Sequence, residues 1–181
     1  MATESLANKY QKKTDKQHVL DNPDTYIGSV EQVETCNWLF DKDNKFINKP
    51  HIYIPGLYKL FDEGIVNARD HVIRMTNKTP VTFIDINIDD EGVITMINDG
   101  DGIDIVEHPE HKVYIPELIF GHLRTSTNYD KTEKKIVGGK NGFGFKLVLI
   151  WSEWGMVETI DANRKLKYTQ YFRDNLDIIE K

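Results

Sequence analysis

The stretch from residue 57 to residue 73 constrains the fold of this chain more than any other part of the sequence. Its apolar residues recur with the spacing of a helix, which predicts a long amphipathic helix with one face turned toward a core. The residues of that apolar face are Leu57, Phe61, Ile65, Ala68 and Val72. We therefore expect the rest of the chain to be organised around this helix.

A line of polar residues occupies the opposite face of the same predicted helix. Glu63, Asn67 and Asp70 follow one another at i, i+4 and i+7, so their side chains stack along the helix axis. Such a line is most often a solvated surface. Apolar residues flank this line, however, and Gly64 interrupts the helix at a cost of about 1 kcal/mol relative to alanine. These details favour a face that is covered by something, and the pattern alone leaves both interpretations open.

The composition limits the class of protein. With 181 residues, of which 39% are hydrophobic, the chain is long enough for one soluble globular domain with a core of its own. No apolar run reaches membrane-spanning length and the N-terminus is polar, so we expect no membrane partner. Cys36 is the single cysteine, which excludes an intrachain disulfide and favours an intracellular, reducing setting. The net charge of −6 argues against this segment wrapping nucleic acid by itself.

The other segments predict short helices and antiparallel hairpins. Besides the long helix, helices are expected at 15–21, 116–123 and 147–151, and strands at 37–40, 46–54, 81–88, 93–97, 157–160 and 166–172. Residues 26–29 are expected to be extended, with a break at the glycine. This order predicts an α+β fold, a two-layer sandwich with helices on one face of a mostly antiparallel sheet.

Two glycine-rich segments are candidates for a close approach between the backbone and a ligand. The first ends at Lys146 and contains Gly138, Gly139, Gly142 and Gly144, directly before an apolar helix. Glycines in such a place present backbone N–H groups suited to phosphate oxygens, and the lysine adds a positive charge. The alternative is a flexible turn. The spacing is not that of a Walker A loop.

The second glycine-rich segment follows a predicted strand and runs from Asn98 to Gly102. An amide or carboxylate oxygen at a strand end accepts a hydrogen bond from an exocyclic amine, such as that of adenine. An Asx-type turn is the alternative interpretation. The hydroxyl and amide groups of Ser126, Thr127 and Asn128 suit contacts with ribose or phosphates, or an ordinary polar loop.

In this order, the motifs resemble those of the Bergerat-fold (GHKL) ATPases. The particular residues within these motifs are similar to those of the N-terminal ATPase domain of eukaryotic-type type II DNA topoisomerases. The matching stretches are residues 10–14, 23–29, 61–63, 66–68, 114–117, 119–123, 125–126, 128–130 and 138–142, together with Gly144 and Lys146. The resemblance therefore covers nearly the whole chain.

The resemblance implies a site for ATP and Mg²⁺ and a role for each matching residue. Glu63 would be the catalytic base that polarises the attacking water, and Asn67 would bind both ATP and Mg²⁺. Asn98 would take the adenine side, Asp70 would support the site, and residues 139–146 would form a lid over the triphosphate. The implied ATP contacts beyond Asn67 are Asp70, Asn98, Asp99, Gly102, Ser126, Thr127, Asn128, Gly139, Lys140, Asn141, Gly142, Phe143, Gly144, Phe145 and Lys146.

The resemblance also implies partners. Residues 1–30 would be an arm and strap that reach the other subunit of a homodimer closed by ATP, and residues 31–181 the ATP-binding domain. The strap residues would be Tyr10, Tyr26, Ile27 and Gly28. The chain would then lack the last strands and the transducer domain of a longer enzyme that passes one DNA duplex through another, and would hydrolyse ATP weakly or not at all alone. Such an enzyme would act in the nucleus, or in host cytoplasm or a virion if virus-encoded.

The residues that depart from the pattern of the resembling domains include Gly64, Arg69, Thr127 and Phe145. Phe145 stands where those domains have a small alanine, and Gly64 where they have a bulkier aliphatic residue. Compensatory packing between these two positions is a hypothesis that the sequence cannot test.

Two other functions remain open on sequence alone. One is a stand-alone module that binds ATP and a partner without DNA chemistry. The other is a histidine-kinase or chaperone ATPase of the same fold, which the Tyr-Ile-Gly-Ser and Thr-Ser-Thr-Asn segments disfavour.

Overall fold

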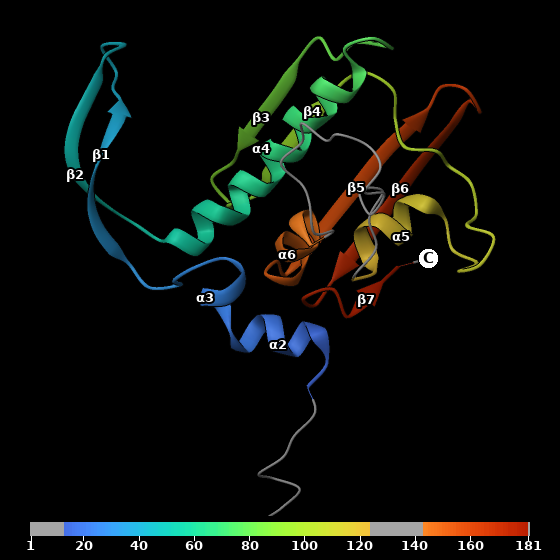
Figure 1. Ribbon diagram of the computed structural model, residues 1–181, viewed down its shortest axis with the longest axis horizontal. Coiled ribbons are helices and arrows are strands. Elements are labelled where there is room, and N and C mark those ends of the chain that lie inside the picture. Colours follow the sequence, from blue (N-terminus) through green and yellow to red (C-terminus); the bar gives the residue numbers. More distant parts are fainter. Residues whose placement is uncertain (1–12, 124–142, 181) are drawn as a thin grey trace, which may run out of the picture. The chain divides into compact units, whose positions relative to one another are not determined.

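The computed structural model describes residues 13–123 and 143–180, and Figure 1 labels their helices and strands. The helices are α2 (Asp15–Asp21), α3 (Pro23–Tyr26), α4 (Pro55–Met75), α5 (Ile115–Gly121) and α6 (Gly144–Ile150). The strands are β1 (Val33–Phe40), β2 (Phe46–Tyr53), β3 (Ile84–Ile88), β4 (Ile94–Asn98), β5 (Trp154–Asp161), β6 (Leu166–Arg173) and β7 (Ile178–Ile179). The strands of the described ranges pair antiparallel in three sheets, β1–β2, β3–β4 and β5–β6–β7. The chain contacts divide into two units, Met1–Gly56 and Leu57–Lys181.

Two short helices, α2 and α3, precede the hairpin in the described part of the first unit. Helix α2 begins at Asp15 because the hydroxyl of Thr14 accepts a hydrogen bond from the backbone N–H of Gln17, at 3.1 Å. Pro23 cannot extend this helix and instead begins α3, where its fixed φ suits the first helical position. Tyr26 therefore belongs to a helix, and the expectation of an extended segment was wrong for this residue. The predicted glycine break does occur, since Gly28 has a φ of +91°.

The β1–β2 hairpin completes the first unit. Val33 pairs with Tyr53 at the open end and Phe40 with Phe46 near the turn, so β1 begins four residues earlier than predicted. The predicted interruption by Pro50 is absent, because this residue keeps the register opposite Cys36. Proline lacks a backbone N–H, and it is tolerated in a two-stranded ribbon at positions where the N–H would face away from the partner strand.

In the second unit, α4 packs against the β3–β4 hairpin. A β-carbon at Gly64 would lie 2.5 Å from Sδ of Met96 on β4, so the two elements meet at this glycine. Ala68, one turn further, is buried as the helical pattern predicts. Leu57 was expected on the same apolar face but is 58% exposed. This leucine lies about 10 Å along the helix axis before the contact with β4, which explains its exposure.

The β5–β6–β7 sheet carries helices α5 and α6. A β-carbon at Gly121 of α5 would lie 3.3 Å from Cε1 of Phe172 on β6, and the side chain of Leu149 of α6 contacts Gly155 of β5. Leu147, Leu149, Ile150 and Phe172 are buried and form much of the core of this unit. Helices on antiparallel sheets confirm the predicted α+β class. The two residues of β7 are too few to leave a periodic signal in the sequence.

Candidate functional site

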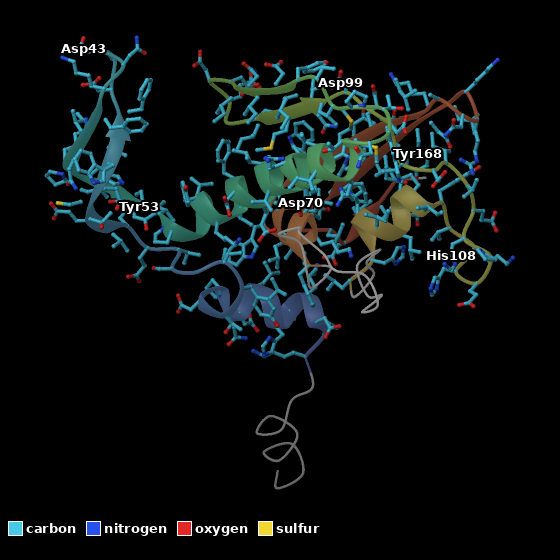
Figure 2. All side chains as sticks on the ribbon, turned by 45° about the horizontal axis from the view of Figure 1, so that its top comes forward. Asp43, Tyr53, Asp70, Asp99, His108 and Tyr168 are labelled. Atoms are coloured by element: carbon cyan, nitrogen blue, oxygen red, sulfur yellow. The ribbon has the colours of Figure 1, made fainter. Side chains whose placement is uncertain are left out.

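The polar line of α4 is not a uniformly solvated face. The side chain of Glu63 is 17% exposed and Asp70 only 4%, whereas Asn67 is exposed. Figure 2 shows Asp70 on α4, amid the side chains of the second unit. The Asn67 amide turns back along the helix, where its Nδ2 donates a hydrogen bond to the carbonyl oxygen of Glu63 at 2.7 Å. The solvated interpretation therefore holds for Asn67 and fails for the two acidic residues.

Glu63 has a cationic partner on its own helix. The ammonium nitrogen of Lys59 lies 2.6 Å from Oε1 of Glu63 and 3.4 Å from Oδ2 of Asp62. The hydrogen bond with Glu63 is the main reason that the pKa of Lys59 is raised. Lys59 was absent from the residues that the sequence predicted, although its i, i+4 spacing from Glu63 was a usable signal.

The first turn of α6 lies against the polar line of α4. A β-carbon at Gly144 would lie 2.8 Å from Oε2 of Glu63 and 3.5 Å from Nδ2 of Asn67. Predicted site residues from two separate parts of the sequence, α4 and the start of α6, are thus brought together. Because the position lacks a side chain, backbone and carboxylate approach each other closely here. The expected loop is wrong at its end, since residues 144–146 form the first turn of the helix.

Phe145 and Gly64, two of the residues that depart from the family pattern, lie beside each other. A β-carbon at Gly64 would be 3.8 Å from Cε2 of Phe145, although its nearest neighbour would be the sulfur of Met96. The ring of Phe145 also packs edge-on against Phe120 of α5, with centroids 5.6 Å apart. The two positions are therefore close enough for a side chain at residue 64 to meet Phe145, and Met96, which the sequence did not indicate, lies nearer still.

Lys146 is a buried cation in the first turn of α6. The residue is only 3% exposed, and burial lowers the pKa of its ammonium group to about 8. Removal from water disfavours the charged form of a lysine, so an anion brought close to it would stabilise that form. This property fits the predicted role of Lys146 as a positive charge for a phosphate.

The end of β4 is organised by Asp99, which Figure 2 labels. Its carboxylate accepts hydrogen bonds from the backbone N–H groups of Thr82, at 2.7 Å, and Phe83, at 3.2 Å, and from the Thr82 hydroxyl at 2.5 Å. The Thr82 hydroxyl is the main cause of the lowered pKa of Asp99. Because these donors are used, β3 begins at Ile84 and not at the predicted residue 81. The neighbouring Asn98 donates to the carbonyl of Asp99 at 3.0 Å.

Gly102 accommodates a neighbouring strand. A β-carbon there would overlap the carbonyl oxygen of Ile160 on β5 and lie 2.7 Å from Oγ1 of Thr159. The same Thr159 oxygen accepts a hydrogen bond from the N–H of Ile103 at 2.9 Å. The predicted close approach therefore exists, but the approaching group is the backbone of the protein itself. Contacts of Asn98, Asp99 and Gly102 with ATP remain predictions.

Several predicted residues lie outside the described ranges. They are Tyr10, Ser126, Thr127, Asn128, Gly139, Lys140, Asn141 and Gly142. Of the other strap residues, Tyr26 has its hydroxyl 2.9 Å from Nδ1 of His18, and Ile27 is buried. Phe143 immediately precedes α6 as its N-cap residue, and its carbonyl accepts the N–H of Leu147 at 3.0 Å.

Two absences apply to residues 13–123 and 143–180. No helix there is long and apolar enough to cross a membrane. No group of three or more His, Cys, Asp or Glu side chains gathers there as a ready-made metal site. Mg²⁺ is commonly held by one or two protein oxygens together with substrate phosphates, so a single amide such as Asn67 fits that mode of binding.

The class of protein follows from the sequence of the region that holds this geometry. Residues 53–173 match the family described as histidine kinase-, DNA gyrase B-, and HSP90-like ATPase. The match includes α4, β4 and α6, and with them the described residues of the candidate site. The chain therefore belongs to this ATPase family, and the site lies on a nucleotide-binding fold.

Within the family, the chain is similar to DNA topoisomerase 2. It is 50% identical over 179 residues to DNA topoisomerase 2 of Acanthamoeba polyphaga mimivirus, covering 95% of this chain and 14% of that protein. The ATPase region of Saccharomyces cerevisiae topoisomerase II superposes with a TM-score of 0.91 at 46% identity, covering 97% of this chain and 46% of that one. The ATPase and transducer domains of Balamuthia mandrillaris DNA topoisomerase II give 0.92 at 44%, covering 96% and 44%. These findings confirm the resemblance and the predicted fold.

Proposed function

We propose that this chain is the ATP-binding part of the N-terminal gate of a type II DNA topoisomerase. ATP binding closes a homodimer, and hydrolysis resets it, so that one DNA duplex passes through another. The chain spans only 14% of the mimivirus relative, so this activity belongs to a protein with more domains than this segment. The names of the relatives and the geometry of the α4–α6 contact support the proposal.

The observation that carries the proposal is the meeting of Glu63, Asn67 and Gly144. A largely enclosed carboxylate, an exposed amide and a helix start without a side chain lie within one small region. Hydrolysis of a phosphoanhydride needs a water positioned by a general base, and a ligand for the metal that neutralises the phosphates. Glu63 supplies the base, and Asn67 supplies a hard oxygen ligand for Mg²⁺.

The remaining roles complete the site. Asn98 accepts the adenine amine at the end of β4, while Asp99 and Gly102 shape the turn beside it. Asp70 supports the line on α4 from its buried position. Lys146 contributes positive charge to the triphosphate. The other contacts with ribose, phosphates and the lid are made by Ser126, Thr127, Asn128, Gly139, Lys140, Asn141, Gly142, Phe143, Gly144 and Phe145.

The arm and strap form the dimer contact. Residues 1–30 form this segment and residues 31–181 the ATP-binding domain, with Tyr10, Tyr26, Ile27 and Gly28 reaching the second subunit when ATP is bound. The enzyme works in the nucleus, or in host cytoplasm or the virion if it is encoded by a virus. DNA is bound by the other domains, since this segment carries a net charge of −6.

A titration of the natural full-length protein tests the proposal. A non-hydrolysable ATP analogue with Mg²⁺ should bind saturably, and energy transfer between dyes on the N-terminal segments of the two subunits should rise with occupancy. Asn67→Ala should weaken the Mg²⁺-dependent part of the affinity about tenfold, whereas Asn87→Ala, an exposed amide on β3, should leave it unchanged. Unlinking of interlocked DNA circles should require hydrolysable ATP. No saturable binding, or binding without a rise in energy transfer between the two subunits, would contradict the proposed gate.

A further inference from the structure

Lys59 and Glu63 form an ion pair of uneven exposure. The two residues are one helical turn apart on α4, with Nζ of Lys59 and Oε1 of Glu63 at 2.6 Å. The lysine side chain is 41% exposed, whereas the glutamate is 17% exposed. The second acidic neighbour, Asp62, is further away at 3.4 Å and 40% exposed. Ion pairs that involve an exposed side chain contribute little to stability, so the Lys59–Glu63 pair is better explained by a role other than stabilising the fold.

The two oxygens of Glu63 face different groups. Oε1 faces the ammonium group of Lys59, and Oε2 lies 2.8 Å from the position of a β-carbon at Gly144. The terminal torsion of a glutamate has a broad energy minimum, so an unrestrained carboxylate rotates readily. A charge-assisted hydrogen bond to one oxygen restricts this rotation and directs the other oxygen toward the start of α6.

We propose that Lys59 is a positioning residue that holds the Glu63 carboxylate in the orientation needed to polarise the attacking water. The inference rests on the proposed function, because it requires Glu63 to be the catalytic base. Lys59 itself is assigned no contact with ATP and acts only through Glu63. Catalytic groups must be held within roughly 0.5 Å of their working geometry, and a displacement of about 1 Å costs on the order of 100-fold in rate. The pKa of Lys59 is raised by its hydrogen bond to Glu63, so the cation persists across the neutral range.

The experiment compares three variants of the natural full-length protein. Lys59→Met removes the charge while keeping a long side chain, Lys59→Arg keeps a cation, and Asp62→Asn removes the weaker partner. For each variant, kcat and KM for ATP, the Kd of a non-hydrolysable analogue and the melting temperature are measured. Lys59→Met should lower kcat by about 10- to 100-fold while KM and Kd change less than about threefold. Lys59→Arg should recover most of kcat, and Asp62→Asn should behave like the unchanged protein.

Two results would overturn the positioning role. One is a kcat of Lys59→Met within about twofold of the unchanged protein. The other is a joint loss of kcat, analogue affinity and melting temperature, which describes a merely structural lysine. Glu63→Gln separates this inference from the proposed function. If Glu63→Gln is inactive and Lys59→Met is active, only the positioning role fails. If Glu63→Gln keeps full turnover, the assignment of the base fails as well.

Discussion

The turn after β4 and the start of α6 both place glycine at a close contact, yet the contacting groups differ. Gly102 makes room for the backbone of Ile160 on β5, a group that cannot move without disturbing a sheet. Gly144 makes room for the carboxylate of Glu63, the end of a side chain, which can shift without moving the backbone. Both segments are rich in glycine, and for that reason both were predicted as places where the backbone approaches a ligand. The comparison shows that glycine spacing reports a close approach without identifying the approaching group.

Replacing Gly102 should produce the largest loss of stability. In Gly102→Ala, the new β-carbon would overlap the carbonyl of Ile160, so β5 or the turn must shift. We expect the free energy of unfolding to fall by about 3 kcal/mol or more. Gly92→Ala is the control, because a β-carbon there meets nothing within 4 Å. Its φ of +82° alone should cost about 1 kcal/mol. Urea denaturation measures the free energy of unfolding of both variants. Equal losses in the two variants would show that the contact with Ile160 does not matter for stability.

Replacing Lys146 tests whether the start of α6 holds a charge at a cost in stability. The folded-state pKa is about 8, against an ordinary value of 10.5. Below pH 8 both states are protonated and the folded state bears the full desolvation cost. Between about 8 and 10.5 the unfolded state binds more protons, so stability rises with pH. Lys146→Met should therefore be more stable by up to about 3 kcal/mol at pH 7, with the advantage vanishing above pH 10.5. A pH-independent difference between the two proteins would contradict this account.

The contact between Gly64 and Phe145 predicts coupled effects. Gly64→Leu should destabilise the protein by about 1–2 kcal/mol, because the new side chain must displace Met96 and the ring of Phe145. Phe145→Ala leaves space in the same place. In the double variant the leucine should fill that space, so the combined loss should be smaller than the sum by about 1–2 kcal/mol. Additive losses in a double-mutant cycle would exclude compensation.

Replacing Gly144 should affect turnover more than stability. In Gly144→Ala, the β-carbon would push Oε2 of Glu63 out of its orientation, which a side-chain end can accommodate without moving the backbone, whereas alanine favours the helix. We expect the free energy of unfolding to change by less than about 1 kcal/mol and kcat to fall about tenfold. This pattern is the opposite of that expected for Gly102→Ala. A loss of stability as large as that of Gly102→Ala would show that both glycines make room for groups that cannot move.

Much of the fold could be predicted because it depends on local patterns. The long helix, the hairpins and the α+β order follow from periodicity and turn residues. The errors arose where a distant group decided the outcome. Residues 81–83 alternate like a strand, but the carboxylate of Asp99 takes the N–H groups of Thr82 and Phe83. Leu57 fits the apolar stripe yet lies beyond the reach of β4.

The candidate site was predictable in outline and not in its contacts. Spacing on one helix placed Glu63 and Asn67 on a common face, and family motifs supplied their roles. Neither source showed that Gly144 would meet Glu63, because that contact depends on how α6 packs against α4. The burial of Lys146 could not be predicted either, because it also depends on how α6 packs, and a lysine beside glycines is normally expected to be exposed.

The central claim is that Glu63 is the base of an ATPase site, and Glu63→Gln tests it most directly. In the natural full-length protein, ATP turnover and the affinity for a non-hydrolysable analogue should be measured side by side. The amide keeps the shape of the side chain but cannot accept a proton, so turnover should fall by at least about 100-fold. Analogue affinity should stay within about threefold, because the base does not hold the nucleotide. Turnover within about twofold of the unchanged protein would contradict the account.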